Sequence, residues 1–567
     1  MLATAAFGVG ALAGAVRGPD ERGVAERYVR AWERGDYAAM YRELSPAARR
    51  RVGRARFAEL HRLALATATA RSLASGRAGK PHDGTVAVPM VVRTRIFGTV
   101  RAPLVLPVTG SGSEARVDWR RSLTFPGVPP GAELTREVTM PPRATLLARD
   151  GKILAQGAAR TPSPALADVA ADTVGQLGPA PAERQAELMA LGVPPGQPVG
   201  VSGLERALDV ALLGRPGGRL LGGTELLASS APRQAPPVRT SIAPSVERAA
   251  IAGLAGRLGG IVALDPRTGE LLGFAGIAFS GLQPPGSTFK ILTLTGALEA
   301  GVAKPTDAYA VETAATLEGV QLENANGESC GGSLANAFAE SCNSVFAPLG
   351  ARLGAQRLVA TAEHFGFNAP PGIPGAATST IPAAGDIGDD LAVGSTAIGQ
   401  GRVQATALQM ASIAATIGLR GRRPRLRLTL DDPAAGDTGT GSPGRATSPA
   451  VARTVEKLML GVVRHGTGTA AALPGVRVAG KSGTAELQTT RKCAQPTEPD
   501  AAGGPAACAP DQSTDDPTDT DAWFAAYAPA GDGRPRAAVG VLLVRSGAGG
   551  TTAAPVAREV LRAMLQR

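Results

Sequence analysis

Near the start of the chain, large apolar residues return every three or four positions, a spacing typical of helices. The pattern covers residues 20–65 and is interrupted by Ser45-Pro46. Its members are Tyr28, Trp32, Tyr37, Met40, Tyr41 and Leu44. Apolar and polar residues then alternate at 85–96, 100–108 and 116–124, which predicts antiparallel strands. We therefore predict a helix pair followed by a curved sheet, a small α+β domain over residues 20–136.

The pattern changes near Pro141. Residues 143–155 predict two short strands joined by a turn at Asp150-Gly151. A segment rich in Pro and Ala follows, with a helix predicted at 203–213 and a Pro-Gly-Gly break at 216–218. Residues 137–238 are interpreted as a β-rich linker or pedestal domain with a structural rather than a catalytic role.

The last 330 or so residues mix helical and strand patterns. An amphipathic helix is predicted at 245–258, and residues 260–273 predict a hairpin with its turn at 266–269. Further strand patterns lie at 476–487, 521–528 and 536–545, and a helix from Ala554 closes the chain. Two low-complexity insertions, 431–449 and 493–518, are interpreted as surface loops. We predict one large mixed domain over residues 239–567.

Length and charge narrow the function classes. A chain of 567 residues predicts three to four domains. The net charge of +11 suits an anionic membrane or cell wall, and no basic run with interleaved aromatics indicates nucleic-acid binding. Residues 1–16 carry no charge, so we predict that 1–18 is a signal anchor or signal peptide; a buried N-terminal helix is the alternative.

Cysteine and histidine positions give no metal signature. Of the four cysteines, Cys493 and Cys508 bracket a Pro/Gly/Ala-rich loop, which is compatible with a disulfide outside the cell. The four histidines are scattered, so no histidine-based triad is indicated. We expect neither a metal nor a cofactor.

The segment Pro285-Gly-Ser-Thr-Phe-Lys290 carries the first chemical signal. After the Pro-Pro-Gly turn a helix is predicted, with Ser287 at its start and Lys290 one turn later on the same face. A buried, deprotonated amine at this spacing could accept the proton of the Ser287 hydroxyl. Since only seven lysines occur in a chain that otherwise uses arginine, a lysine here is informative. The alternative is a serine helix cap beside an exposed lysine.

Two later segments supply matching groups. Ser341 and Asn343 offer a second hydroxyl and an amide that could relay protons and hold a substrate carbonyl. Residues 478–486 predict a strand in which Lys481 is a fixed cation, Ser482 and Thr484 offer hydroxyls, and Gly483 admits a substrate backbone.

In this order the three segments resemble the penicillin-binding proteins, whose signature is Ser-x-x-Lys, Ser-x-Asn and Lys-Thr/Ser-Gly. Further similar segments are 398–401, 409–411, 466–469 and 522–529. Residues 143–155 resemble the opening of the pedestal (dimerisation) domain of class B members, and 117–126 resemble the NTF2-like domain of the MecA-type subgroup. The resemblance implies an α/β transpeptidase fold, an antiparallel sheet flanked by helices, after the two smaller domains.

The resemblance also implies a reaction. Ser287 would attack the penultimate D-Ala carbonyl of a peptidoglycan stem peptide, with Lys290 as general base and Ser341 and Asn343 assisting. Lys481, Ser482 and Thr484 would hold the terminal carboxylate, and β-lactam antibiotics would acylate Ser287. Such a D,D-transpeptidase would be anchored in the cytoplasmic membrane with its catalytic domain outside. Because residues 20–240 lack a glycosyltransferase pattern, a separate SEDS-type glycosyltransferase would supply the glycan strands.

Four other functions are compared with this one. A β-lactamase would need a deacylating base, which is not identified, and the two preceding domains argue against it. A β-lactam sensor would need several membrane helices, which the sequence does not indicate. A D,D-carboxypeptidase would use water in place of the acceptor amine. An inactive scaffold that binds a division partner is disfavoured by the intact motifs.

Overall fold

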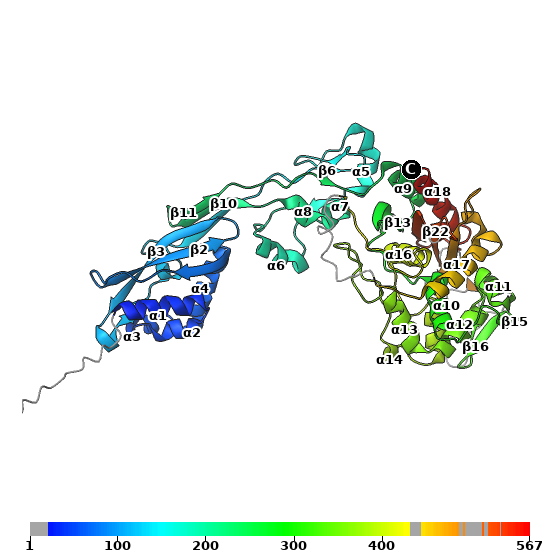
Figure 1. Ribbon diagram of the computed structural model, residues 1–567, viewed down its shortest axis with the longest axis horizontal. Coiled ribbons are helices and arrows are strands. Elements are labelled where there is room, and N and C mark those ends of the chain that lie inside the picture. Colours follow the sequence, from blue (N-terminus) through cyan, green and yellow to red (C-terminus); the bar gives the residue numbers. More distant parts are fainter. Residues whose placement is uncertain (1–20, 431–443, 487–491, 494–512, 515–519, 533) are drawn as a thin grey trace, which may run out of the picture. The chain divides into compact units, whose positions relative to one another are not determined.

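The computed structural model describes residues 21–430, 444–486, 492–493, 513–514, 520–532 and 534–567 (Figure 1). The chain forms two compact units. One comprises residues up to 143 with 179–198 and 213–235, and the other comprises 144–178, 199–212 and 236–567. The predicted anchor at 1–18 lies outside the described residues. Within the described ranges, no helix is both long and apolar enough to cross a bilayer.

The first unit packs helices on an antiparallel sheet of order β1-β2-β3-β4. Its helices are α1 (Glu21–Glu33), α2 (Tyr37–Arg42), α3 (Pro46–Arg51) and α4 (Arg54–Thr67), and its strands are β1 (Ala70–Ser75), β2 (Thr85–Thr94), β3 (Thr99–Thr109) and β4 (Arg116–Val117). The predicted helix pair is thus divided into four helices. Side chains cap the N-termini of α2 and α3: Asp36 accepts from the Ala39 N–H, and Ser45 accepts from the Ala48 N–H.

The strand predicted at 116–124 is wrong beyond Val117. Only Arg116 and Val117 pair with β3, and residues 121–124 form a 3-10 turn. The chain leaves the sheet at Asp118, whose carboxylate is held by the Arg51 guanidinium and the Ser45 hydroxyl. These side-chain contacts join residues about seventy positions apart, so alternation along the strand does not reveal them.

A second sheet of this unit has the order β11-β10-β5. It is formed by β5 (Leu134–Thr139), β10 (Gly217–Gly222) and β11 (Glu225–Ser230), and α6 (Ala182–Leu191) belongs to the same unit. The break predicted at 216–218 is wrong, because Gly217 and Gly218 begin a strand. A Cβ at Gly218 would collide with the Glu137 carbonyl, so glycine is what allows β10 to pair with β5 there.

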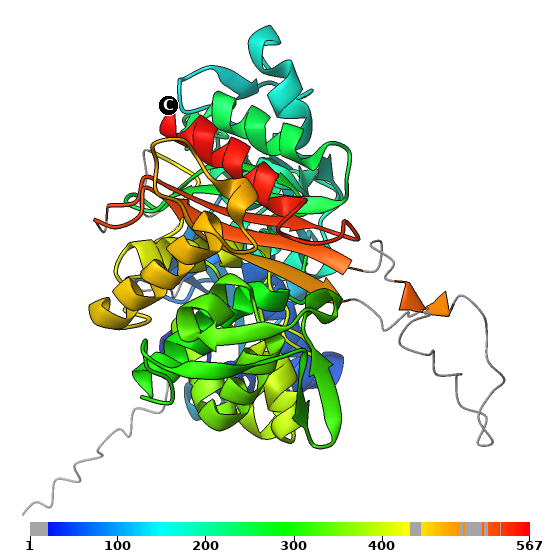
Figure 2. The same cartoon turned by 90° about the vertical axis from the view of Figure 1, so that its right-hand side faces the viewer.

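The second unit is built on a five-stranded antiparallel sheet of order β14-β13-β23-β22-β19. Its strands are β13 (Gly259–Asp265), β14 (Glu270–Gly276), β19 (Ala479–Glu486), β22 (Thr520–Ala528) and β23 (Ala537–Leu543). The predicted hairpin and the three later strands are confirmed. Helices α9 (Pro244–Leu254) and α18 (Ala553–Leu565) pack side by side on one face (Figure 2), and the fully buried α16 (Ala407–Gly418) packs on the other.

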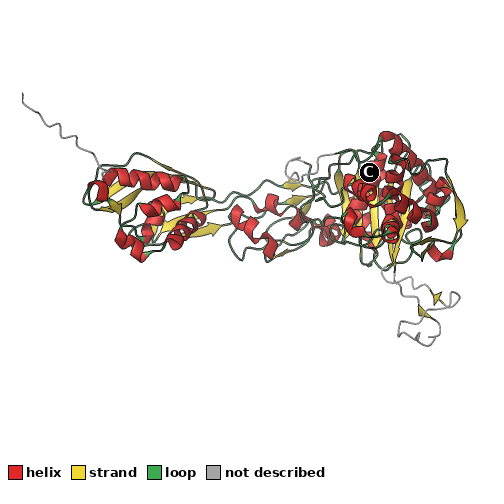
Figure 3. Ribbon diagram, turned by 90° about the horizontal axis from the view of Figure 1, so that it is seen from below, coloured by secondary structure: helices red, strands yellow, loops and turns green. Residues whose placement is uncertain are grey.

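Beyond α16 lies a helical layer with small hairpins, so that helices flank both faces of the large sheet (Figure 3). The helices are α10 (Lys290–Glu299), α11 (Leu334–Ala339), α12 (Asn343–Leu353), α13 (Ala355–His364), α14 (Ala384–Ile387), α15 (Asp390–Ala397) and α17 (Pro449–Arg464). The hairpin strands are β15 (Ala308–Glu312), β16 (Ala314–Leu317), β17 (Val320–Glu323) and β18 (Cys330–Ser333). Helix α10 packs against α12, α13 and α17, which fixes its start beside the sheet.

The rest of the second unit consists of short elements. They are β6 (Leu146–Leu147), β7 (Ile153–Ala155), α5 (Ala167–Thr173), β8 (Leu177–Gly178), β9 (Val199–Gly200), α7 (Gly203–Ala207), α8 (Asp209–Leu213), β12 (Val238–Arg239), β20 (Lys492–Cys493) and β21 (Ser513–Thr514). Strands β6 and β7 confirm the strand, turn and strand predicted at 143–155. The two predicted surface insertions lie largely outside the described residues.

Glu247 of α9 is a fully buried carboxyl that links α9 to α5. Its Oε1 lies 2.6 Å from the Thr173 hydroxyl, which is also 2.7 Å from the Val169 carbonyl, and its Oε2 accepts from the Phe274 N–H. The Thr173 hydroxyl has one proton and cannot donate to both oxygens. If it donates to the Val169 carbonyl, a protonated Glu247 can donate to the Thr173 oxygen, and both hydrogen bonds are made. Burial raises the pKa of Glu247 from 4.5 to about 8, although its hydrogen bonds with Thr173 and the Phe274 N–H oppose the rise.

Replacing Glu247 by glutamine should make the protein less sensitive to alkaline pH. Because the folded state holds the Glu247 proton up to about pH 8 and the unfolded state releases it near 4.5, wild-type stability falls as pH rises through this window. The loss should be of the order of a few kcal/mol, and the glutamine variant should not show it. Urea unfolding at about pH 5 and about pH 9 measures the difference. The same pH dependence in both proteins would contradict a protonated Glu247.

Candidate active site

The turn that carries Ser287 lies directly against strand β19. Residues 286–289 form a 3-10 turn, and the α-helix α10 begins at Lys290. Ser287 therefore lies in a 3-10 turn that leads into the helix, and not in the first turn of the α-helix itself. Gly286 has φ +51°, and a Cβ there would lie 2.5 Å from the Thr484 carbonyl. A Cβ at Gly483 would lie 2.8 Å from the Pro285 carbonyl. One glycine on each segment therefore lets the two backbones approach closely and places the half-buried Ser287 beside the Lys-Ser-Gly segment. Its hydroxyl has no hydrogen-bond partner among the described residues.

Lys290 is fully buried behind Ser287, and its amine reaches the Ser-x-Asn segment. Nζ donates to the Ser341 carbonyl and to Asn343 Oδ1, both at 2.6 Å, and lies 3.4 Å from Ser341 Oγ. A neutral amine has two N–H donors and one lone pair. The two carbonyl-type acceptors use both donors and leave the lone pair free to take a proton. Burial, and secondly the positive charge of Lys481, hold the pKa of Lys290 well below its usual range.

Ser341 is held in a left-handed conformation at the end of α11, with φ +66°. The Ser341 N–H donates to Phe338 O (3.3 Å) and the Cys342 N–H donates to Ala337 O (2.9 Å), the paired bonds of a Schellman motif. Glycine usually occupies this position, since a Cβ costs roughly 1–2 kcal/mol in the left-handed region. Asn343 then begins α12 and donates from Nδ2 to the Glu323 carbonyl. The turn thus aims a carbonyl, a hydroxyl and an amide at Lys290.

Lys481 is the second buried amine and lies on β19. Nζ donates to the Ser482 carbonyl at 3.1 Å and stands 5.6 Å from the centre of the Phe338 ring, while Lys290 Nζ stands 5.7 Å from the Phe346 ring. Burial lowers the pKa of Lys481 to about 7, and the nearby Glu340 carboxylate opposes the shift. The two amines therefore differ: Glu340 favours the charge on Lys481, and that charge disfavours one on Lys290.

The hydroxyls of β19 are also held in place. Ser482 Oγ lies 2.6 Å from Thr467 Oγ1, and Thr467 is bound to the Ala339 carbonyl through both its N–H (3.1 Å) and its hydroxyl (3.2 Å). Thr484 Oγ1 accepts from the Gly549 N–H at 3.3 Å. Thr467 thus connects the end of α11 to β19. Sequence reasoning gave it no role, although it lies in the segment 466–469 that resembles the family.

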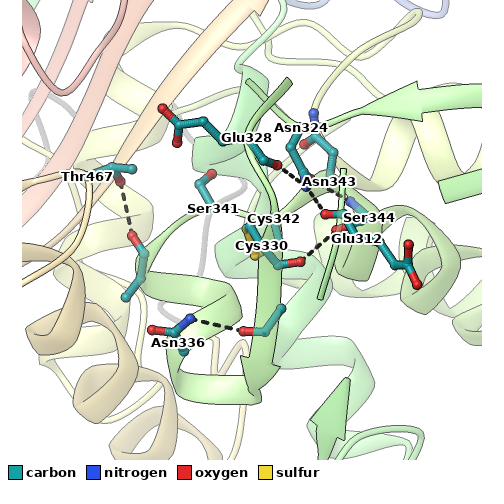
Figure 4. The surroundings of a disulfide bond; sticks show 12 residues. Glu312, Asn324, Glu328, Cys330, Asn336, Ser341, Cys342, Asn343, Ser344 and Thr467 are labelled. Atoms are coloured by element: carbon teal, nitrogen blue, oxygen red, sulfur yellow. Dashed lines mark hydrogen bonds between the residues drawn. A yellow bond between two sulfur atoms is a disulfide. The ribbon is translucent and has the colours of Figure 1, made fainter. Parts of the chain in front are cut away.

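A disulfide joins Cys330 of β18 to Cys342, the middle residue of the Ser-x-Asn segment, with Cα atoms 5.6 Å apart (Figure 4). The sequence did not indicate this pair. The disulfide predicted between Cys493 and Cys508 falls outside the part of the chain whose side chains the structure describes. Over the part of the chain that the structure describes, no cluster of three or more His, Cys, Asp or Glu side chains could hold a metal ion.

Together these groups suit acyl transfer. The site offers a hydroxyl nucleophile, a buried amine with a free lone pair, and a separate cation flanked by hydroxyls that could hold a carboxylate. All of the residues singled out from the sequence for catalysis and substrate binding meet here. They come from the turn before α10, from the α11–α12 turn, and from β19.

Comparisons with known proteins agree with this chemistry. Residues 259–562 match the family described as "Penicillin binding protein transpeptidase domain". The chain is 34% identical over 424 residues to "Peptidoglycan D,D-transpeptidase PbpA" of Mycolicibacterium smegmatis, covering 64% of this chain and 80% of that protein. The protein of the same name from Mycobacterium tuberculosis is 38% identical over 307 residues, which cover 51% of this chain and 56% of that protein.

A solved structure is similar as well. It is described as "Structure of penicillin-binding protein A from M. tuberculosis: penicillin G acyl-enzyme complex". The TM-score is 0.55 at 28% identity, and the match covers 75% of this chain and 100% of that chain. The similarity therefore extends well beyond the three short segments.

Proposed function

Because this chain belongs to the penicillin-binding protein transpeptidase family, it is a peptidoglycan D,D-transpeptidase of cell-wall synthesis, and we propose that Ser287 is its nucleophile. The observation that carries the proposal is the amine of Lys290. It is buried one turn after Ser287, and two carbonyl oxygens take both of its N–H donors. That leaves a lone pair to accept the Ser287 proton as the hydroxyl attacks.

The acylation step follows from these positions. Ser287 Oγ attacks the penultimate D-Ala carbonyl of a stem peptide, and Lys290 takes the hydroxyl proton. Lys290 and the Ser341 hydroxyl, 3.4 Å apart, pass the proton to the leaving D-Ala nitrogen. The backbone N–H groups of Ser287 and Thr484 stabilise the oxyanion, an effect typically worth about 3 kcal/mol per donor. The amine of a second stem peptide then displaces Ser287 and forms the crosslink.

Substrate binding is assigned to β19. Lys481 holds the terminal carboxylate together with the hydroxyls of Ser482 and Thr484, and Asn343 orients the peptide. The missing side chain of Gly483 lets the turn that carries Ser287 lie against the strand, because a Cβ there would lie 2.8 Å from the Pro285 carbonyl oxygen. β-Lactams present a similar carboxylate and a strained acyl group, so they acylate the same serine.

The domain organisation, the membrane anchor and the partner enzyme belong to the same proposal. Residues 20–136 form an NTF2-like domain of the MecA type, 137–238 a pedestal or dimerisation domain, and 239–567 the transpeptidase domain. Residues 1–18 anchor the chain, with the catalytic domain outside the cytoplasmic membrane. A SEDS-type glycosyltransferase supplies the glycan. The four helices packed on an antiparallel sheet in the first unit support the first of these assignments, and the family resemblance supports the others.

The proposal is tested by the products that the purified protein forms. With a D-Ala-D-Ala peptide and an amine acceptor, mass spectrometry should detect release of one D-Ala and a new amide to the acceptor. Water competes with the amine for the same acyl-enzyme, so omitting the acceptor should leave only slow hydrolysis. Hydrolysis at an equal rate with or without the amine would identify a D,D-carboxypeptidase instead. No product and no covalent adduct with a fluorescent penicillin would identify a scaffold.

A further inference from the structure

The conformation of Ser341 is unfavourable unless the surrounding structure holds it. Its φ of +66° places a residue with a Cβ where a helix normally ends in glycine. Backbone strain of this kind persists only where neighbouring contacts fix it, and it is concentrated at functional sites. Here the strained residue supplies the carbonyl that accepts from Lys290 Nζ at 2.6 Å, and its hydroxyl lies 3.4 Å from that amine.

If this turn relaxed, the groups around Lys290 would move apart. Rotation of Ser341 out of the left-handed region would turn its carbonyl away from Nζ and shift Asn343, whose Oδ1 is the other acceptor. Both N–H groups of the neutral Lys290 amine are occupied, and its lone pair is left for a proton, only while both acceptors stay in place. The geometry of proton transfer therefore depends on what fixes the residues that follow Ser341.

The contacts that fix those residues come from β18 and the segment before it. Cys342, next to Ser341, is fully buried and covalently joined to Cys330, and Ser344 Oγ donates to the Cys330 carbonyl at 3.3 Å. The Asn324 side chain accepts from the Ser344 N–H at 2.9 Å and supports the first turn of α12. Figure 4 shows the disulfide adjoining Ser341 and Asn343. Of these contacts, the disulfide is the covalent one and the one nearest to Ser341.

We propose that Cys330 and Cys342 are positioning residues for acylation: their disulfide holds the Ser341 turn in the strained conformation that keeps the two acceptors of the Lys290 amine in place. Neither sulfur touches the substrate. The inference rests on the proposed function, since it concerns the rate of the step assigned to Ser287 and Lys290. A positioning role lowers the acylation rate of each folded molecule when the disulfide is lost. A role in stability alone would leave that rate unchanged and lower only the number of folded molecules.

The test replaces Cys330 by serine, which removes the disulfide and leaves Ser341-Cys342-Asn343 intact. Stopped-flow acylation by a fluorescent penicillin gives the first-order rate constant at saturation, the dissociation constant of the non-covalent complex, and the amplitude, which counts active molecules. We expect the rate constant to fall about tenfold or more, since small misplacements of catalytic groups have effects of this size, while the dissociation constant stays within about twofold. A rate constant within about twofold of wild type, with only the amplitude or melting temperature lowered, would overturn the proposal.

A matched control is Ser344→Ala, which deletes the hydrogen bond to the Cys330 carbonyl but keeps the disulfide. Its rate constant should stay within about twofold of wild type, and a decrease equal to that of Cys330→Ser would assign the effect to strand packing instead. If Cys330→Ser does not fold, wild type reduced with a phosphine and verified by mass takes its place under the same criteria. Wild-type protein that forms no adduct at Ser287 would refute the proposed function, whereas equal rates in labelled proteins would refute only this inference.

Discussion

Ser287→Ala should abolish covalent labelling by penicillins and all D-Ala release. As the proposed nucleophile, Ser287 supplies the oxygen that becomes acylated, and alanine has no atom to take its place. Losses on removal of a nucleophile reach about a millionfold, which is below detection in a gel assay with fluorescent penicillin. Intact-protein mass spectrometry after incubation with penicillin should show an adduct on wild type and none on the variant.

The same substitution should leave the fold unchanged. Ser287 is half-buried, and its hydroxyl has no hydrogen-bond partner among the described residues, so its removal should cost at most about 1 kcal/mol, the usual value for a serine near a helix start. Circular dichroism and the melting temperature check this. Adduct formation by a correctly folded Ser287→Ala protein would show that another residue is the nucleophile.

Lys290→Arg should slow acylation by about a thousandfold while keeping a positive charge at the same place. Arginine stays protonated at any pH the protein survives, so it cannot accept the Ser287 proton. In wild type, burial and Lys481 lower the pKa of Lys290, so acylation should fall only when acid returns the proton to this amine. Stopped-flow acylation across the pH range measures both effects, and raising the pH to about 9 should not rescue the variant.

A control substitution separates this effect from a general change of side chain. Lys304→Arg makes the same replacement at an exposed lysine of the same unit and should leave the acylation rate unchanged. If Lys290→Arg acylated within about tenfold of wild type, a neutral lysine could not be the base, and the proton would have to pass through the Ser341 hydroxyl alone.

The sequence predicted the parts of the site that depend on local patterns. A serine and a lysine one turn apart after Pro-Pro-Gly, and a strand containing Lys-Ser-Gly, were recognisable because turns, helix starts and strands have short-range signals. The hairpin at 260–273 was recognisable for the same reason. The roles of Ser287 and Lys290 are tested by the variants above, and the role of Lys481 stays a prediction.

Contacts between segments that are distant in the sequence could not be predicted. Four cysteines allow three pairings, and nothing in the spacing of Cys330 and Cys342 singles out the pair that the structure joins. Thr467 binds Ser482 and Ala339, residues that are neighbours only after folding. The turn at Ser341 was missed because a serine in the left-handed region goes against local preference, and only tertiary contacts can impose it.

The close approach of the two backbones at Gly286 and at Gly483 limits how this enzyme could evolve under antibiotic selection. A methyl group at either position would force the nucleophile turn away from β19, and natural substrate and drug would lose the same geometry. Resistance mutations that leave growth unimpaired are therefore expected at positions other than Gly286 and Gly483. Such positions would contact the incoming drug without separating the two backbones.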